Sequence, residues 1–346
     1  MAQVMMITFQ IKNTLTPDSV SGHATLSGGP HSCYIIFPPH ISGSRNREEL
    51  KDMKWESAGR VRKVMMYPVK SCAGKAVNSA QAKPLGLVNG AVRDRSFILC
   101  KDNGVMITAR MIPSTVLIRP SYEDNILTLK FPGAVDLTVD ISQVEKNDKI
   151  ATTVIWGETV QGLDCGEDAS NWLQRVLGHK SFLLYHANLP STRSTERCNG
   201  GKYPLLRNDD HSLYADLTGH MLMTLESIAD LQTRVFRKIA PEDFRPNILI
   251  DGTRGPYDED EWEYIMIGDA VFRNAKPCTR CIFTTVCHKT GKKDPNMEPL
   301  RTLRKYRCPK GGNDPYFGIN LGLDLPGVVR EGDEVFVTRI ATSKKI

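Results

Sequence analysis

The sequence predicts a strand-dominated α+β protein, in which a β-barrel-like N-terminal domain is followed by a second β-barrel with attached helices. Short segments rich in β-branched and aromatic residues recur along the chain, and turn signals such as Asp102-Asn103-Gly104 separate them. Strands that follow one another without intervening helices are typical of antiparallel barrels and sandwiches. The chain has 346 residues, 40% of them hydrophobic, which is enough to bury a sizeable core.

The first 58 residues are expected to form a poorly ordered leader. They mix Pro, Gly, Ser and His with little apolar periodicity, as in Leu26-Ser27-Gly28-Gly29-Pro30. The folded body is then expected to begin at Gly59. We predict an N-terminal domain over residues 59–182 and a second domain over residues 183–340.

In the N-terminal domain the residue pattern predicts strands and one helix. The strands are expected at 61–67, 96–100, 105–110, 116–119, 126–131, 137–141 and 151–162. The helix is expected at 168–177, with Gly178 as its left-handed C-terminal stop.

The second domain is expected to open with a strand at 182–186 and a polar, Arg-rich loop at 189–210. A helix is predicted from Thr224, which can cap it, to about residue 239, because Ile228, Leu231 and Val235 fall at helical spacing. Further strands are expected at 247–250, 264–267, 270–275, 281–286 and 334–339.

The composition limits the classes of function. The net charge of +6 arises from 45 basic and 39 acidic residues, and this mild excess favours anionic ligands or an acidic partner over nucleic acid. The cysteine count of 9 is odd, in a chain too large to need disulfide staples, so a reducing intracellular compartment is expected. No apolar run approaches the roughly 18 residues of a membrane-spanning helix. Walker, Rossmann, serine-hydrolase and zincin motifs are absent.

The pair Cys278 and Cys281, spaced as Cys-x-x-Cys, contains the residue most suited to chemistry. This spacing is open to redox exchange, to half of a zinc site completed by Cys287 and His288, to one metal ligand beside a bystander, or to two buried unreactive thiols. The strand expected after Cys281 disfavours redox use, because redox dithiols of the thioredoxin type begin a helix. We predict that Cys281 binds a metal as a thiolate.

Three basic segments could bind an anion. Lys70-Ser71 follows the first strand of the body, Arg95 precedes the strand expected at 96–100, and Arg245 precedes the one expected at 247–250. Because Arg245 stands before a proline, its backbone is expected to be extended. Taken singly, each Arg is better explained by a pair with a nearby carboxylate such as Asp94 or Asp243.

In combination and in this order, five motifs resemble the MOSC-domain proteins and, among them, the amidoxime-reducing components. The resemblance extends from about residue 59 to 339, and five ordered motifs are far more specific than any single one. The motifs are Tyr67-Pro68-Val69-Lys70-Ser71, Arg93-Asp94-Arg95, Phe244-Arg245-Pro246-Asn247, Ile267-Gly268-Asp269 and Pro277-Cys278-Thr279-Arg280-Cys281-Ile282-Phe283-Thr284-Thr285.

The resemblance implies an N-terminal MOSC barrel, a catalytic MOSC domain and a molybdenum cofactor, the metal being carried by the dithiolene of a pterin. Cys281 matches the cysteine that is the metal ligand, and is therefore the expected catalytic residue. Thr279 and Arg280 match positions that touch the cofactor, and positions that hold the pterin and its phosphate match Lys70, Ser71, Arg95, Arg245 and Asn247. Thr218 lies where relatives place a small hydroxyl residue near the cofactor. No role is carried onto Asn320, where some relatives have an aromatic residue.

The implied activity is the reduction of N-hydroxylated compounds, amidoximes and hydroxylamines, with electrons from cytochrome b5 and its NADH-dependent reductase. The resemblance also implies attachment to the mitochondrial outer membrane. Residues 1–56 contain no apolar anchor, so a cytosolic location is the alternative. Two other functions stay open: sulfur handling or cofactor maturation, as in other MOSC proteins, and a structural zinc protein or cofactor carrier.

Overall fold

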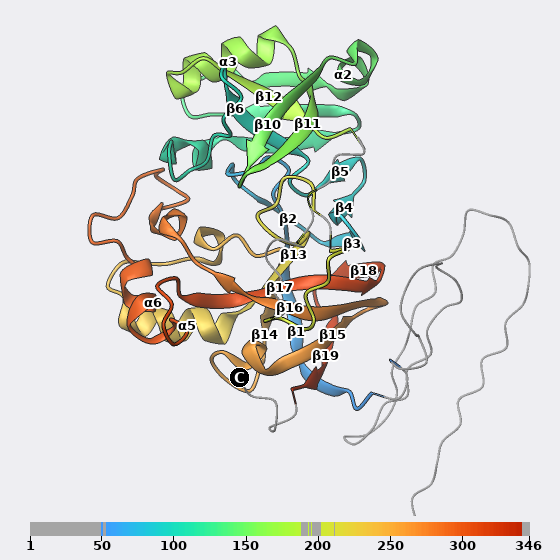
Figure 1. Ribbon diagram of the computed structural model, residues 1–346, viewed down its shortest axis with the longest axis vertical. Coiled ribbons are helices and arrows are strands. Elements are labelled where there is room, and N and C mark those ends of the chain that lie inside the picture. Colours follow the sequence, from blue (N-terminus) through green and yellow to red (C-terminus); the bar gives the residue numbers. More distant parts are fainter. Residues whose placement is uncertain are drawn as a thin grey trace, which may run out of the picture.

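The computed structural model describes residues 50, 53–187, 193, 195, 202–210 and 212–340. They form two stacked lobes (Figure 1). Most of the expected leader lies outside the described residues, and its order stays a prediction. The first strand, β1, spans Glu56–Met66 and so begins before the expected start at residue 61.

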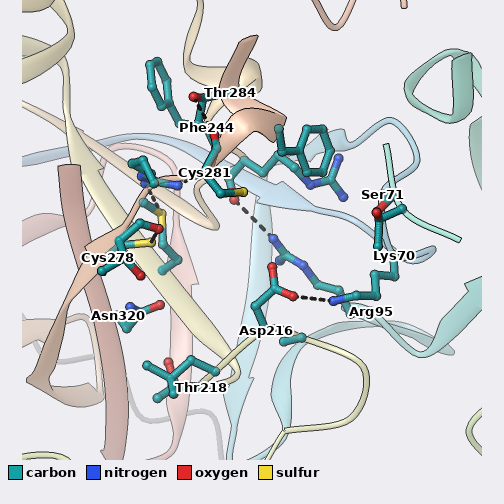
Figure 2. A pocket seen from close by; sticks show the side chains of 18 of the residues that line it. Lys70, Ser71, Arg95, Asp216, Thr218, Phe244, Cys278, Cys281, Thr284 and Asn320 are labelled. Atoms are coloured by element: carbon teal, nitrogen blue, oxygen red, sulfur yellow. Dashed lines mark hydrogen bonds and ion pairs between the residues drawn. The ribbon is translucent and has the colours of Figure 1, made fainter. Parts of the chain in front are cut away.

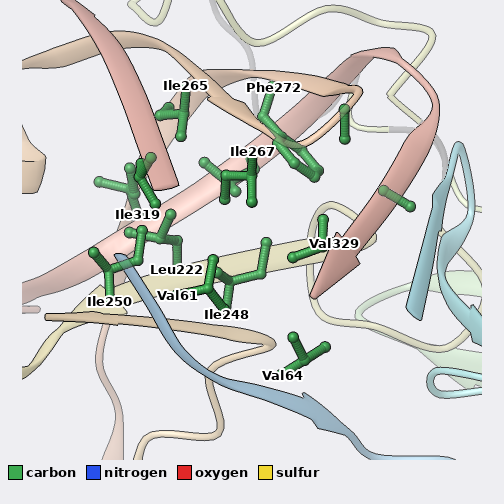
Figure 3. Close-up of a cluster of buried hydrophobic side chains, with 14 of the residues drawn as sticks. Val61, Val64, Leu222, Ile248, Ile250, Ile265, Ile267, Phe272, Ile319 and Val329 are labelled. Carbon is green, nitrogen blue, oxygen red and sulfur yellow. The ribbon is translucent and has the colours of Figure 1, made fainter. Parts of the chain in front are cut away.

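The lower lobe is a closed barrel. Its strands are β14 (Ile248–Asp251), β13 (His220–Thr224), β17 (Tyr316–Leu325), β16 (Ala270–Thr279), β15 (Trp262–Ile267), β19 (Glu334–Arg339) and β1, hydrogen-bonded in that order. Pairing of β14 with β1 closes the barrel, and the short strand β2 (Lys75–Val77) also pairs with β1. The interior is filled by β-branched and aromatic side chains such as Val64, Ile248, Ile265 and Phe272 (Figure 3). The predicted domain boundary stays a prediction, and the barrel sheet joins strands from both sides of it.

The upper lobe consists of two antiparallel sheets with helices packed on them. One sheet has the order β10 (Ile150–Ile155), β11 (Glu158–Asp164), β12 (Ser181–Tyr185) and β6 (Phe97–Lys101); the other is the meander β7 (Arg119–Glu123), β8 (Ile126–Lys130) and β9 (Leu137–Asp140). A further sheet, with the order β18 (Gly327–Arg330), β3 (Ser79–Lys83), β4 (Gly86–Asn89) and β5 (Val92–Arg93), pairs a late strand of the chain with early ones. The predicted strand-dominated fold class is confirmed.

The described α-helices are α2 (Ile141–Asn147), α3 (Glu167–Leu177), α5 (Leu225–Arg234) and α6 (Leu300–Tyr306). The predicted helix 168–177 is confirmed as α3, with Gly178 in the left-handed conformation at φ 74°. Thr224 caps α5 as predicted, but α5 ends earlier than residue 239 because Val235 turns extended. Among the described residues, no helix has the length and apolarity needed to span a membrane.

Some predicted strands are wrong. Segment 105–110 makes only isolated bridges at Val105 and Met106, and 116–117 belongs to the 3-10 helix η1 (Pro113–Leu117). The strand expected at 281–286 is instead the 3-10 helix η4 (Ile282–Thr285), with Cys281 as its N-cap. Its threonines explain the difference: the hydroxyls of Thr284 and Thr285 donate to the carbonyls three residues earlier, which stabilises a turn over an extended chain. The other 3-10 helices are η2 (Pro241–Asp243) and η3 (Asp258–Glu261).

Candidate functional site

A cavity of about 380 Å³ lies where loops of the upper lobe meet one end of the barrel. Figure 2 shows Cys281 and Cys278 on one side of it and Lys70 and Ser71 on the other. All the site residues expected from the sequence line this cavity: Lys70, Ser71, Arg95, Thr218, Arg245, Asn247, Thr279, Arg280 and Cys281. The structure therefore brings together residues that are more than 200 positions apart in the chain, while their individual roles stay predictions.

Lys70 is a buried cation at the cavity wall. Its side chain is 6% exposed, and its Nζ donates to the Asp216 carboxylate at 2.7 Å and to the Tyr214 carbonyl at 2.8 Å. Burial lowers the pKa of Lys70, and the Asp216 carboxylate opposes that shift. Asp216 itself is 71% exposed and also accepts a 2.9 Å hydrogen bond from the Trp156 indole.

Two guanidinium groups flank the Tyr67 ring. Arg95 lies 4.6 Å and Arg245 4.1 Å from the ring centroid. Arg95 pairs with the Asp94 carboxylate and donates to Asn247 Oδ1 at 3.0 Å. The carboxylate pair that the sequence allowed is therefore found for Arg95.

Arg245 has no carboxylate partner among the described residues. Its Nη1 donates to the Cys72 carbonyl, while its Nη2 is buried and has no hydrogen-bond partner there. Burial, together with the nearby Arg95 cation, lowers the pKa of Arg245 to about 10. A half-buried cation with a buried, unused donor is a group that an anion would stabilise.

Three residues of the wall hold a left-handed backbone: Ser71 at φ 68°, Arg95 at φ 49° and Arg245 at φ 61°. The extended backbone expected for Arg245 is therefore wrong. Its amide N–H donates to the Pro241 carbonyl at 3.1 Å, so Arg245 terminates the turn of η2 in the way that left-handed residues terminate helices. Strained backbones of this kind gather at functional sites.

Arg280 is inserted into the end of the barrel and is only 7% exposed. It donates from Nε to the Phe317 carbonyl at 2.7 Å and from Nη1 to the Phe244 carbonyl at 3.0 Å. Burial lowers its pKa, and within the described residues it too has no carboxylate partner. Arg280 thus fixes the chain between the end of β16 and Cys281.

Cys281 is half-buried and free of disulfides. Its carbonyl accepts hydrogen bonds from the Thr284 amide at 3.1 Å and the Thr284 hydroxyl at 3.0 Å, so η4 holds the backbone beneath the thiol. Burial raises the pKa of the neighbouring Cys278 thiol. Cys281 is thereby presented to the cavity from a fixed turn.

The zinc alternative finds no support in the geometry. In the part of the chain that the structure describes, no three side chains of His, Cys, Asp or Glu converge on a point where a metal could sit. Cys278, Cys281, Cys287 and His288 therefore do not form the tetrahedral cluster that a structural zinc requires. His288 instead pairs with Asp243 at 2.7 Å.

Sequence reasoning missed the rim of the cavity. Arg110, Trp156 and Asp216 line it, with the Arg110 guanidinium 4.1 Å from the Trp156 ring centroid. Trp156 falls inside the strand expected at 151–162, and no local pattern marks Asp216 as functional. Asp216 pairs with Lys70 across a long stretch of sequence, and no local residue pattern predicts such a contact.

Both parts of the chain match described families. Residues 58–180 match the MOSC N-terminal beta barrel domain and residues 211–336 match the MOSC domain, so the chain is a MOSC-domain protein. The chain is 36% identical to mitochondrial amidoxime-reducing component 1 of Mus musculus, over 82% of this chain and 83% of that one. It is 34% identical to component 2 of Bos taurus, over 81% and 84% of the two chains. The protein belongs to the family of the amidoxime-reducing components.

Proposed function

We propose that this protein is a molybdenum-cofactor-dependent reductase of N-hydroxylated compounds, amidoximes and hydroxylamines. One observation carries the proposal: a single cavity contains the Cys281 thiol together with cations from distant segments of the chain, of which Lys70 and Arg280 are buried and Arg95 and Arg245 half-buried. The family membership supports the same activity, since the relatives are named for amidoxime reduction.

The residues fit the proposed cofactor. Arg245 has a buried, unpartnered Nη2, and neither Arg245 nor Arg280 faces a carboxylate partner in the described chain, so the cavity suits an anionic group such as a pterin phosphate. The donors that would hold the pterin and its phosphate are Lys70, Ser71, Arg95, Thr218, Arg245, Asn247, Thr279 and Arg280. Cys281 offers the soft thiolate that suits molybdenum.

When bound, the cofactor would supply two-electron oxygen abstraction at its metal. The overall reaction cleaves the N–O bond of the substrate: two electrons and two protons enter, the N-hydroxyl oxygen leaves as water, and an amidine or amine remains. The protein's part is to bind and orient. We propose that Asp216 and Trp156, two exposed residues of the cavity lining, contact the substrate.

The electrons would come one at a time from cytochrome b5, itself reduced by its NADH-dependent reductase. We further propose a mitochondrial location, as the names of the relatives suggest for those proteins. The mild positive charge of +6 would favour an acidic cytochrome.

The test is to measure molybdenum, pterin and zinc in purified wild-type protein and in two cysteine variants. Cys281→Ala should lose molybdenum and the reduction of benzamidoxime by reduced methyl viologen. Cys287→Ala is the matched control, because Cys287 is half-buried but does not line the cavity, and it should keep both. Full reductase activity in Cys281→Ala, or zinc without molybdenum in the wild type, would refute the proposal.

A further inference from the structure

Phe236, in the loop after α5, is the most exposed large hydrophobic side chain of the described residues. Its relative exposure is 110%, whereas its neighbours Val235 and Ile239 are buried at 5% and 6%. A single exposed apolar residue is common on a protein surface and by itself indicates nothing. What distinguishes Phe236 is how the loop around it is held.

The side chain of Gln232 fixes this loop at three points. Its Nε2 donates to the carbonyls of Val235 and Arg237, both at 3.0 Å, and its Oε1 accepts from the amide of Ile239 at 2.9 Å. The backbone on both sides of Phe236 is therefore tied to α5. An exposed aromatic side chain on a backbone that is held in place is a typical binding anchor, because the backbone has little conformational entropy to lose on association.

The same loop is joined to the proposed metal ligand by two hydrogen bonds. Arg237 Nη2 donates to the Thr284 carbonyl at 3.0 Å, and the Thr284 hydroxyl donates to the Cys281 carbonyl at 3.0 Å. Arg237 also pairs with Asp243, a residue of the cavity wall, at 3.5 Å. A protein that contacts Phe236 would thus lie over the short hydrogen-bonded path that leads to Cys281.

Exposed cations lie on the neighbouring helix α6 and in the Phe236 loop. Arg301, Arg304 and Lys305 lie on one face of α6, since they are three and four residues apart, and Lys238 lies two residues after Phe236. α6 lies beside α5 (Figure 1): Arg237 Nε donates to the Glu298 carbonyl at 3.2 Å just before α6, and Arg234 lies 4.5 Å from the Tyr306 ring centroid at its end. Arg234 and Arg237 are paired with Asp230 and Asp243, whereas Lys238, Arg301, Arg304 and Lys305 form no ion pair with a described residue. We call Phe236, Lys238, Arg301, Arg304 and Lys305 the Phe236 face.

We propose that the Phe236 face is the docking site of the electron donor, an acidic haem protein that transfers one electron at each encounter. This inference rests on the proposed function and specifies where its partner binds. Each encounter oxidises one ferrous haem to the ferric state, and two encounters supply the electron pair that N–O cleavage consumes. The cations would steer the acidic partner, and the Phe236 ring would anchor it near Cys281.

The experiment compares two electron donors on the full-length holoenzyme. Phe236→Ser removes the anchor, and the double variant Arg304→Glu/Lys305→Glu inverts the charge. Val135→Ser and Lys146→Glu are the controls, because both residues are exposed on the upper lobe. The readouts are the affinity for the soluble haem domain of cytochrome b5 in a binding assay, the KM for that domain, and the rate with reduced methyl viologen.

We expect Phe236→Ser to weaken binding and raise the KM for the cytochrome by about tenfold, the scale of an interface hot spot. The charge variant should weaken binding at low salt and lose most of the salt dependence. Both face variants should keep the wild-type rate with methyl viologen. Both control variants should match the wild type in all three readouts. If wild-type enzyme fails with methyl viologen, the proposed function fails; if it succeeds and both face variants bind the cytochrome normally, the docking site is refuted. Loss of binding to anionic lipid vesicles, or of self-association, with unchanged cytochrome binding would assign the face to another occupant and also refute it.

Discussion

At the scale of single residues, the cavity wall has non-glycine residues at positions where the backbone is left-handed. Glycine would adopt this backbone conformation with less strain. Ser71, Arg95 and Arg245 all have positive φ angles, and each such conformation costs a non-glycine residue roughly 1–3 kcal/mol. In Arg245 the strained backbone directs a guanidinium between the rings of Tyr67 and Phe283, at 4.1 and 5.4 Å from their centroids. The strained backbone together with these ring contacts indicates that position 245 requires the Arg side chain and not merely a left-handed backbone.

Replacement of Arg245 by Gln should therefore impair the binding of the anionic cofactor more than it impairs folding. A hydrogen bond to a charged group contributes about 1.5–3 kcal/mol, so we expect cofactor retention to fall by roughly one to two orders of magnitude. Pterin and molybdenum content per chain after gel filtration measures the effect. Arg119→Gln, at an exposed position, is the matched control and should keep full content. Equal retention in both variants would contradict a phosphate-binding role for Arg245.

The residues of the site were predictable where a motif places them next to a strand. Lys70, Arg95, Arg245 and Cys281 were all selected from such motifs and all line the cavity. The left-handed backbone of Arg245 was not predictable, because the proline after it favours an extended chain and only the bond to Pro241 shows otherwise.

At the scale of the elements, a buried carboxyl holds the start of α5. The Glu259 side chain accepts hydrogen bonds from the hydroxyls of Thr224 and Ser227, both at 2.9 Å, and is fully buried. Burial raises the pKa of Glu259 to about 7 from an ordinary 4.5, because the charged form loses its solvation. The folded protein thus keeps a proton that the unfolded chain releases.

This shift predicts how stability depends on pH. Between about pH 4.5 and 7 the folded state binds more protons at Glu259 than the unfolded state does, so the contribution of Glu259 to stability falls as pH rises, by up to about 1.4 kcal/mol per pH unit. In urea unfolding at pH 5, 6 and 7, Glu259→Gln should flatten this fall relative to the wild type. Glu123→Gln, at an exposed position of β7, should leave the pH dependence of stability unchanged. An unaltered slope in Glu259→Gln would show that Glu259 is not the titrating group.

An ion pair is buried beside strands β16 and β17, and a methyl group added at Gly322 should disrupt it. Gly322 stands opposite Arg273, which is 2% exposed and binds Asp210 through two bonds of 2.7 Å. A Cβ at Gly322 would overlap the Arg273 guanidinium. We expect Gly322→Ala to lower the free energy of unfolding by about 3–5 kcal/mol, the cost of breaking a buried pair. Gly255→Ala, where a Cβ meets open space, should change it little; similar urea midpoints for both would contradict this account.

The type of element was predictable where the residue pattern was regular. The prediction was wrong where side chains form hydrogen bonds to the nearby backbone, as in η4. Strands 126–131 and 334–339 alternate or cluster apolar residues and are present as β8 and β19. The barrel strands β13 and β17 were missed, since Met221 to Met223 and the glycines Gly318 and Gly322 hide the usual strand signal. Only their neighbours in the barrel make these segments strands.

At the scale of the whole molecule, the cavity depends on both lobes. The barrel contributes Arg280 and Cys281, and the loops that lead into the upper lobe contribute Lys70 and Arg95. Such a meeting of distant segments is not encoded in any local pattern, so the sequence predicted the residues of the site but not the rim where Asp216 meets Trp156. The result is a cavity lined by more cations than carboxylates.

The excess of cations predicts that anions stabilise the cofactor-free protein. Arg280 is buried, Arg245 has a buried Nη2 without a hydrogen-bond partner, and neither has a carboxylate partner in the described chain. A phosphate-type anion that enters only the folded cavity should therefore shift the folding equilibrium toward the native state. Pyrophosphate at about ten times its Kd should add about 1.4 kcal/mol and raise the Tm by roughly 2–3 °C in thermal melts. Sodium chloride at equal ionic strength is the control for screening, and Arg245→Gln should lose at least half of the pyrophosphate effect. A pyrophosphate shift no larger than that of chloride would mean that the cations are balanced within the protein, and the cavity would then have no preference for an anionic cofactor.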